Sequence, residues 1–143
     1  MGKKPSQFVR NANDKKKGVR FGLIDAFRCA GNGVRYVVAT QRNIKIQAAV
    51  ALLAIVFGFV LSLPLSSWLA IIICIAAVFC AECMNTALES VVDLVSPEYH
   101  ELAKRAKDCA AAGVLICAFC SVVIGVVVYS QAIMECLGIG GFF

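Results

Sequence analysis

Three carboxylates and an amide share one face of a strongly apolar stretch of this sequence: Glu82, Asn85, Glu89 and Asp93. At ~100° per residue, Glu89 and Asp93 fall within roughly 20° of Glu82 on a helical wheel, and the stripe rises roughly 16 Å along the helix axis. A charge inside a membrane span is costly unless it is paired, hydrated or protonated. The stripe therefore predicts a cation-binding or proton-handling site that faces a cleft.

The depth of each acid along the stripe suggests its chemistry. Glu82 lies deepest in the apolar stretch, where we expect it to act as a general base. Glu89 and Asp93 lie nearer the polar end, and carboxylate oxygens suit hard divalent cations such as magnesium. The next linker adds three basic residues, Lys104, Arg105 and Lys107. Carboxylates beside basic side chains at a membrane surface predict phosphoryl transfer from a nucleotide.

Two other interpretations of the stripe stay open. It could be a set of hydrogen bonds that holds helices together, but one Asn or Thr would serve for that, and three carboxylates repel one another. It could also line a non-catalytic oligomeric protein that conducts or carries cations or protons. A carrier should have charged residues at depth on several helices. The apolar segments 48–65 and 109–130 contain no charged residue, which favours phosphoryl transfer over a carrier.

The elements that must position these residues are helices in a membrane. Sixty per cent of the 143 residues are hydrophobic, and the mean hydropathy is +0.81. A soluble helical bundle of this length could not bury so much apolar surface, and a span needs about 20 residues. We predict an all-α integral membrane protein with three spans, at about 44–63, 67–95 and 108–131.

Charge sets the expected orientation. Eleven of the fourteen Lys and Arg lie in residues 1–45, the linker 61–67 carries no charge, and no basic residue follows residue 130. By the positive-inside rule, the N-terminus, the second linker and the site face the cytoplasm of a multi-pass cell-membrane protein. The lysines at 15–17 favour attraction to anionic lipid headgroups over nucleic-acid binding.

The chain divides by composition into a tail, a membrane domain and a short end. We expect residues 1–18 to be a basic, disordered cytoplasmic tail, 19–135 the membrane domain and 136–143 a C-terminal tail. Apolar residues recur irregularly at helical spacing over about 19–38, which predicts an amphipathic helix in the membrane interface. Gly31, Asn32 and Gly33 predict a bend or break in it.

The stretch "AECMNTALESVVDLVSPEYHELAKRAKDCAAAGVLI" resembles the small bacterial membrane lipid kinases, the diacylglycerol kinase and undecaprenol kinase family. The family motif E-x-x-N-[ST]-A-[IL]-E-x-V-V-D is matched from Glu82 to Asp93. The downstream E-Y-H-x-L-x-x-x-A-K-D is matched from Glu98 to Asp108. The similarity in organisation extends over about 22–132.

The resemblance implies a homotrimer that transfers the γ-phosphate of ATP directly to a lipid alcohol with Mg2+, without a phosphoenzyme, at sites between subunits. It makes Glu82 the general base and places Asn85, like Glu82, near the acceptor hydroxyl. It makes Glu89 the carboxylate for metal and nucleotide. The nucleotide is contacted by Lys107 and Asp108, whereas Asp93 lies in the motif as a further candidate metal ligand.

One position departs from the family pattern. The family commonly has Glu before Arg-Asn at the start of the first span, whereas "TQRNIKIQ" has Gln41 there and Gln47 where relatives often carry His. Gln41 remains a candidate for the metal and nucleotide site, but it supplies no charge. Metal affinity is then weaker, or another acid such as Glu98 compensates, or the chain binds nucleotide without turnover.

The resemblance also bears on the acceptor. The linker "LSLPLSSW" and the run from Val91 to Asp108 look more like the Gram-positive branch, which favours undecaprenol. Diacylglycerol is the alternative, since both acceptors present one hydroxyl at the interface.

Overall fold

The computed structural model of the chain describes residues 22–139. The basic tail expected over 1–18 lies outside this range, as do the last four residues of the expected C-terminal tail. The described residues form four helices: α2 (Leu23–Thr40), α3 (Arg42–Val60), α4 (Leu65–Val95) and α5 (Glu101–Cys136). The predicted all-helical class is confirmed, with no strand between residues 22 and 139.

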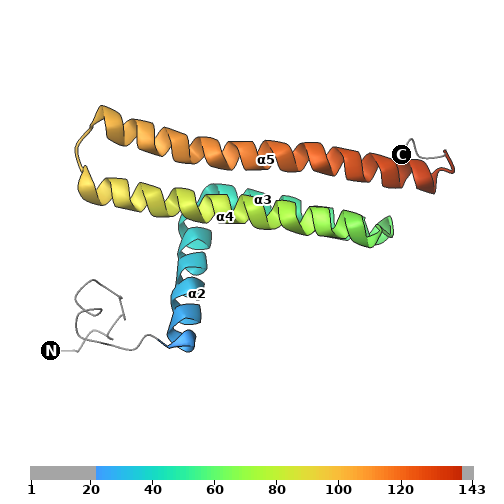
Figure 1. Cartoon of the computed structure of the whole chain (residues 1–143), viewed down its shortest axis with the longest axis horizontal. Helices are drawn as coiled ribbons and strands as arrows, with labels where there is room; N and C mark the ends of the chain where they lie inside the picture. Colours follow the sequence, from blue (N-terminus) through green and yellow to red (C-terminus); the bar gives the residue numbers. More distant parts are fainter. Residues whose placement is uncertain (1–21, 140–143) are drawn as a thin grey trace. The chain divides into compact units, whose positions relative to one another are not determined.

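Helices α3, α4 and α5 are each long and apolar enough to cross a membrane, as the composition predicted. The last two have 31 and 36 residues, or about 46 and 54 Å at ~1.5 Å per residue. Both exceed the ~30 Å of a hydrocarbon layer. In Figure 1, α4 and α5 run antiparallel on either side of a short turn, and α3 lies beside α4.

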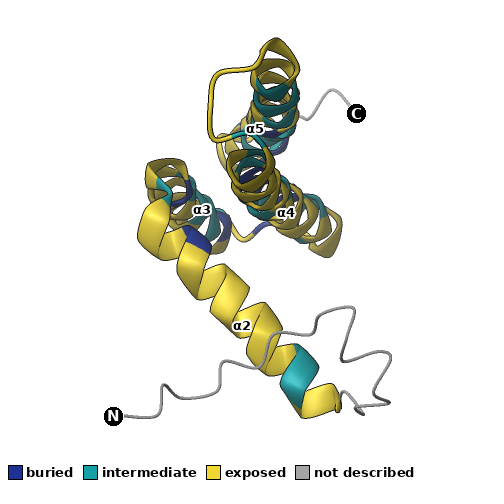
Figure 2. Cartoon of the chain, turned by 90° about the vertical axis from the view of Figure 1, so that its left-hand side faces the viewer, coloured by how far each residue is buried: buried dark blue, intermediate teal, exposed yellow. Residues whose placement is uncertain are grey.

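The three helices are packed tightly at the end away from that turn. A Cβ on Gly58 would lie 2.9 Å from Cη2 of Trp68, so α3 and α4 approach closely there because residue 58 has no side chain. The Tyr129 hydroxyl donates a hydrogen bond of 2.5 Å to the carbonyl of Ala54, which joins α5 to α3. A small core of Leu63, Ile71, Val128 and Ala132 lies nearby. Figure 2 places the buried residues on the facing sides of the helices.

Helix α2 runs without interruption through Gly31 and Gly33, so the predicted break at this point is wrong. Glycine costs only about 1 kcal/mol relative to alanine inside a helix. The combined cost of two glycines is too small to end a hydrogen-bonded helix of this length. The break comes instead at Gln41, whose backbone is extended (φ −90°, ψ 125°) between α2 and α3. Along α2 large apolar side chains such as Leu23, Ile24 and Phe27 are exposed.

Candidate active site

An amide clamp holds the carboxylate of Glu89 from both sides. Gln41 Nε2 donates to Glu89 Oε2 at 3.2 Å, and Asn85 Nδ2 donates to Glu89 Oε1 at 3.0 Å. Asn85 lies one turn before Glu89 on α4, while Gln41 is the extended residue between α2 and α3. The backbone break at Gln41 therefore brings its side chain to the stripe.

Glu82 is the least exposed residue of the stripe. Its side chain is the largest fully buried one of the described chain, with 1% of the residue exposed. The backbone carbonyl of Glu82 accepts a 2.9 Å hydrogen bond from the Thr86 hydroxyl, which the helix geometry allows at this spacing. Within residues 22–139, neither Glu82 Oε2 nor Asn85 Oδ1 has a hydrogen-bond partner, although both atoms are buried. A buried acceptor without a donor is costly, so each of these oxygens is available to a bound ligand.

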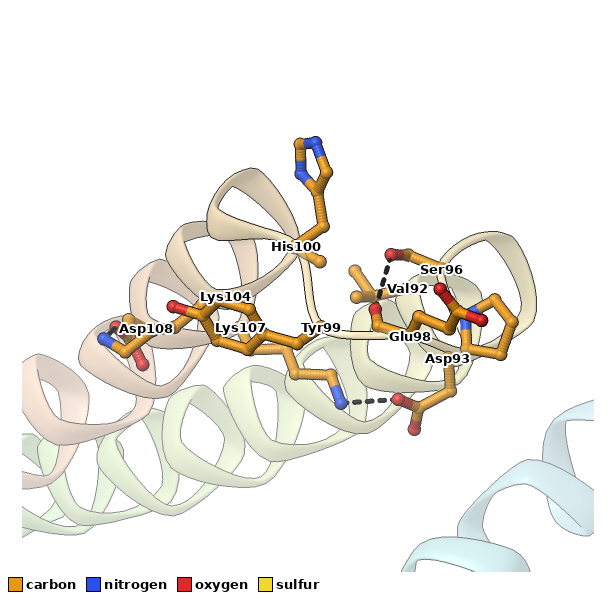
Figure 3. Close-up of a pocket in the computed structure, with 11 residues that line it drawn as sticks. Val92, Asp93, Ser96, Glu98, Tyr99, His100, Lys104, Lys107 and Asp108 are labelled. Carbon is orange, nitrogen blue, oxygen red and sulfur yellow. Dashed lines mark hydrogen bonds and ion pairs between the residues drawn. The ribbon is translucent and has the colours of Figure 1, made fainter.

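Asp93, the fourth member of the predicted stripe, lies apart from the other three. It is exposed near the end of α4, and its Oδ1 pairs with Lys107 Nζ at 2.5 Å. Lys107 reaches back from α5, so this ion pair joins the two helices next to their turn (Figure 3). Asp108 pairs with Lys104 at 2.6 Å along α5. The two nucleotide candidates of α5 are therefore both occupied by ion pairs within the chain.

A pocket of about 300 Å³ lies at this turn, lined by the end of α4 and the start of α5. Asp93, Lys104, Lys107 and Asp108 contribute to its wall, together with Glu98, Tyr99 and His100. His100 Nδ1 accepts a hydrogen bond from the backbone N–H of Leu102, which caps the start of α5. Figure 3 shows the imidazole of His100 pointing away from the Asp93–Lys107 pair. This histidine therefore has a structural role in the described chain.

Gln47 is a polar residue to which the sequence assigned no function. Its Oε1 is buried and finds no partner among the described residues. Gln47 also lines an apolar groove between α3, α4 and α5. The only hint in the sequence was that Gln47 stands where relatives often carry His. Nothing in the helical pattern predicts that its oxygen is left unpaired.

The oxygen donors of the site suit a magnesium ion shared with water and substrate phosphates better than a metal held by protein ligands alone. Among the described residues, no three His, Cys, Asp or Glu side chains cluster as a ready-made metal cage. Magnesium usually takes one or two protein carboxylates and completes its shell with water and substrate phosphates. Glu89, with the unpaired amide oxygen of Asn85 beside it, fits that second arrangement.

A family model described as prokaryotic diacylglycerol kinase matches residues 28–129. The chain belongs to the prokaryotic diacylglycerol kinase family. The match takes in every site residue described above, from Gln41 to Asp108. Family membership makes the chain a membrane lipid kinase, which sets aside the conducting or carrier alternative.

Named relatives in the prokaryotic diacylglycerol kinase family carry two activities. The undecaprenol kinase of Bacillus subtilis strain 168 is 38% identical over 104 residues, which cover 73% of this chain and 85% of that protein. The diacylglycerol kinase of Synechocystis is 44% identical over 104 residues, but these cover 72% of this chain and only 59% of that relative. The diacylglycerol kinase of Escherichia coli K12 is 32% identical over 101 residues, 71% of this chain and 83% of that protein.

Proposed function

We propose that this lipid kinase transfers the γ-phosphate of ATP to undecaprenol, giving undecaprenyl phosphate at the cytoplasmic face of the cell membrane. The observation that carries the proposal is the position of Glu82. Its carboxylate is fully buried on a membrane helix, and Oε2 has no partner within residues 22–139. A carboxylate so placed is ready to accept the proton of a lipid hydroxyl that enters from the apolar side.

Each remaining site residue has a proposed part in the same transfer. Glu82 takes the hydroxyl proton, and the alcohol oxygen then attacks the γ-phosphorus directly, with no phosphoenzyme. The bond between the γ-phosphorus and the bridging β-phosphate oxygen breaks, and ADP leaves. Asn85 lies one turn from Glu82 and orients the Glu89 carboxylate through their hydrogen bond. Lys107, Asp108 and Gln41 contact the nucleotide, so that Lys107 exchanges its pairing with Asp93 for the phosphates.

Glu89 is the residue that would hold Mg2+ together with the nucleotide. When bound, the cation would neutralise phosphate charge. The protein supplies one carboxylate, because the Glu89 partner at position 41 is a neutral amide. Asp93 is the weaker candidate as a ligand, since its carboxylate is paired with Lys107.

The acceptor is the part of the proposal on which the relatives divide. The Bacillus relative, named undecaprenol kinase, aligns over 85% of its length, which supports undecaprenol. The Synechocystis relative, named diacylglycerol kinase, has the higher identity, which supports diacylglycerol as the second candidate. One hydroxyl at the membrane interface serves the chemistry in either case.

We further propose that the active protein is a homotrimer with its N-terminus and active site in the cytoplasm. Large apolar side chains remain exposed along α2, α3, α4 and α5, and lipid tails or other copies of the chain would cover them. Helix α2 would lie in the interface. This arrangement follows the basic N-terminal region and the expected topology.

The test is transfer of labelled γ-phosphate from ATP with Mg2+ in mixed micelles, with undecaprenol and diacylglycerol supplied separately. The native chain should label undecaprenol more efficiently, and Glu82→Gln should lose roughly 10²–10⁴-fold in rate, the usual contribution of a general base. Glu135→Gln, an exposed acid on α5 far from the stripe, should retain the native rate. Folded trimer that labels neither lipid would contradict the proposal and favour a chain that only binds nucleotide.

A further inference from the structure

Helix α2 carries an apolar face that the described chain leaves uncovered. At ~100° per residue, its large apolar side chains fall within an arc of about 100° on a helical wheel. All of them are exposed: Leu23, Ile24, Phe27, Val34 and Val38. Figure 2 shows α2 exposed along almost its whole length. A helix with such a face suits the plane of a membrane interface.

The two basic residues of α2 lie on one edge of this apolar face. On the same wheel Arg28 and Arg35 are about 20° apart, just outside the apolar arc. The opposite edge has the small, uncharged residues Ala26 and Gly33. Asp25, the one acid of α2, lies in the first turn, where the helix dipole favours a negative charge. The positive charge of α2 is therefore concentrated along a single edge.

Both arginines are free to bind an anionic partner. Each is exposed, and neither forms an ion pair with another residue between 22 and 139. A guanidinium binds phosphate oxygens through two parallel hydrogen bonds. Its apolar stem can lie along the edge of a membrane-bound helix while the charged end reaches the headgroups. Arg28 and Arg35 are about 10 Å apart along the helix, at ~1.5 Å per residue, so they reach separate positions on a membrane surface.

The connection between α2 and α3 indicates what covers this surface. Only Gln41 separates the last residue of α2, Thr40, from the first residue of α3, Arg42. Helix α3 is long and apolar enough to cross a membrane. One end of α2 is therefore tied to the end of a span, where the headgroup layer lies. The apolar face of α2 complements the acyl chains there, and its basic edge complements the phosphates.

The geometry points to α2 as a binding surface for anionic phospholipids, with Arg28 and Arg35 on the headgroup phosphates and the apolar face inserted beside them. This inference rests on the proposed position of α2 in the interface and names the lipid class that it binds. A surface with net negative charge attracts each arginine, whereas a zwitterionic surface carries no net charge to do so. Gln41 follows α2 directly and donates to Glu89, so the lipid-bound helix ends next to a residue of the candidate active site.

Amide hydrogen exchange tests this surface without ATP or an acceptor lipid. The full chain is placed in nanodiscs of phosphatidylcholine alone, and of phosphatidylcholine mixed with phosphatidylglycerol. Phosphatidylglycerol should slow exchange within residues 23–40 on the order of ten-fold, because each arginine near an anionic surface adds to binding. High salt should remove the gain, since it screens these charges. Equal exchange in the two membranes would overturn the inference, whether or not the chain is a kinase.

Matched substitutions assign the effect to the two arginines. Arg28→Gln combined with Arg35→Gln changes helix propensity little and should abolish the gain from phosphatidylglycerol, whereas Arg28→Lys with Arg35→Lys keeps the charge and should retain most of it. Arg105→Gln, which removes an exposed charge from α5, should leave exchange in α2 unchanged. Exchange in α3, α4 and α5 reports the folding of each variant, and the salt response of the native chain needs no variant. A gain that survives the glutamine pair would contradict the inference and assign lipid binding to basic residues outside α2.

Discussion

Gln41 Nε2 and Glu89 Oε2 are joined by a 3.2 Å hydrogen bond that connects the residue before α3 to the polar end of α4. With Asn85 on the other oxygen, the Glu89 carboxylate has an amide donor on each side. Its charge is therefore stabilised by neutral groups in the absence of a cation. This arrangement distinguishes the chain from one with a second carboxylate at position 41.

Replacing Gln41 by Glu should increase the affinity of the site for divalent cations. Two facing carboxylates repel each other until a cation lies between them, and a close charge pair near a protein surface is worth on the order of 1–4 kcal/mol. We expect the Mg2+ concentration for half-maximal activity to fall roughly ten-fold, and Mn2+ binding without nucleotide, followed by electron paramagnetic resonance, to become measurable. Gln41→Met serves as the control without added charge. Similar Mn2+ binding by the two variants would show that residue 41 does not face the cation.

Removing the Lys107 ammonium should weaken nucleotide binding selectively. Lys107→Met should raise KM for ATP by about ten-fold, because hydrogen bonds to charged groups contribute about 1.5–3 kcal/mol, and should leave the acceptor KM unchanged. Arg105→Gln is the control, since Arg105 forms an exposed ion pair with Glu101 on the same helix. A Lys107→Met enzyme with native KM for ATP would remove Lys107 from the nucleotide site.

A side chain at residue 58 should destabilise the packing of α3 against α4. In Gly58→Ala the new Cβ would meet Trp68 Cη2 at 2.9 Å and Leu63 Cδ1 at 3.3 Å, and the Trp68 ring is itself packed on Phe59, with centroids 4.7 Å apart. Overpacking of this kind costs about 1–3 kcal/mol. Thermal unfolding in detergent should therefore show a lower Tm. Gly113→Ala is the matched control, because nothing in the described chain lies within 4 Å of its Cβ position; equal Tm values would contradict the expectation.

Loss of the Tyr129 hydroxyl should loosen the attachment of α5 to α3. Tyr129→Phe removes the donor to the Ala54 carbonyl and keeps the ring, so the free energy of unfolding should fall by about 0.5–1.5 kcal/mol. Titration with a denaturing detergent measures this change. Tyr99→Phe removes an exposed hydroxyl that bonds to Glu101 and should cost less. A larger loss for Tyr99→Phe would argue against a structural role for the Tyr129 bond.

The sequence predicted the helices and the face of α4 that carries the site, but not how the helices meet. The wheel placed Glu82, Asn85 and Glu89 together because helical periodicity determines which residues share a face. Periodicity does not determine the depth of one helix against another. The approach of Gln41 to Glu89 depends on that depth, so it emerges only from the folded chain.

Asp93 illustrates the same limit at the end of a helix. The wheel placed it on the same face as Glu82 but nearer the polar end of the helix, and its side chain is 66% exposed close to the end of α4. Its partner, Lys107, comes from the next helix across a turn whose conformation the residue types did not specify. The predicted break at Gly31–Gly33 was wrong for a related reason. Glycine lowers the stability of a helix but does not determine where the helix ends.

The cross-helix side-chain hydrogen bonds of residues 22–139 are distributed unevenly along the bundle. At the site, Gln41–Glu89 and Asp93–Lys107 join helices through groups that a nucleotide or cation would compete for. Away from it, Gly58 against Trp68 and Tyr129 bonded to Ala54 hold the helices through contacts with no proposed part in the chemistry. A nucleotide or cation that binds at the site would therefore replace hydrogen bonds and ion pairs between the helices there. The contacts at the other end of the bundle would not be involved in binding.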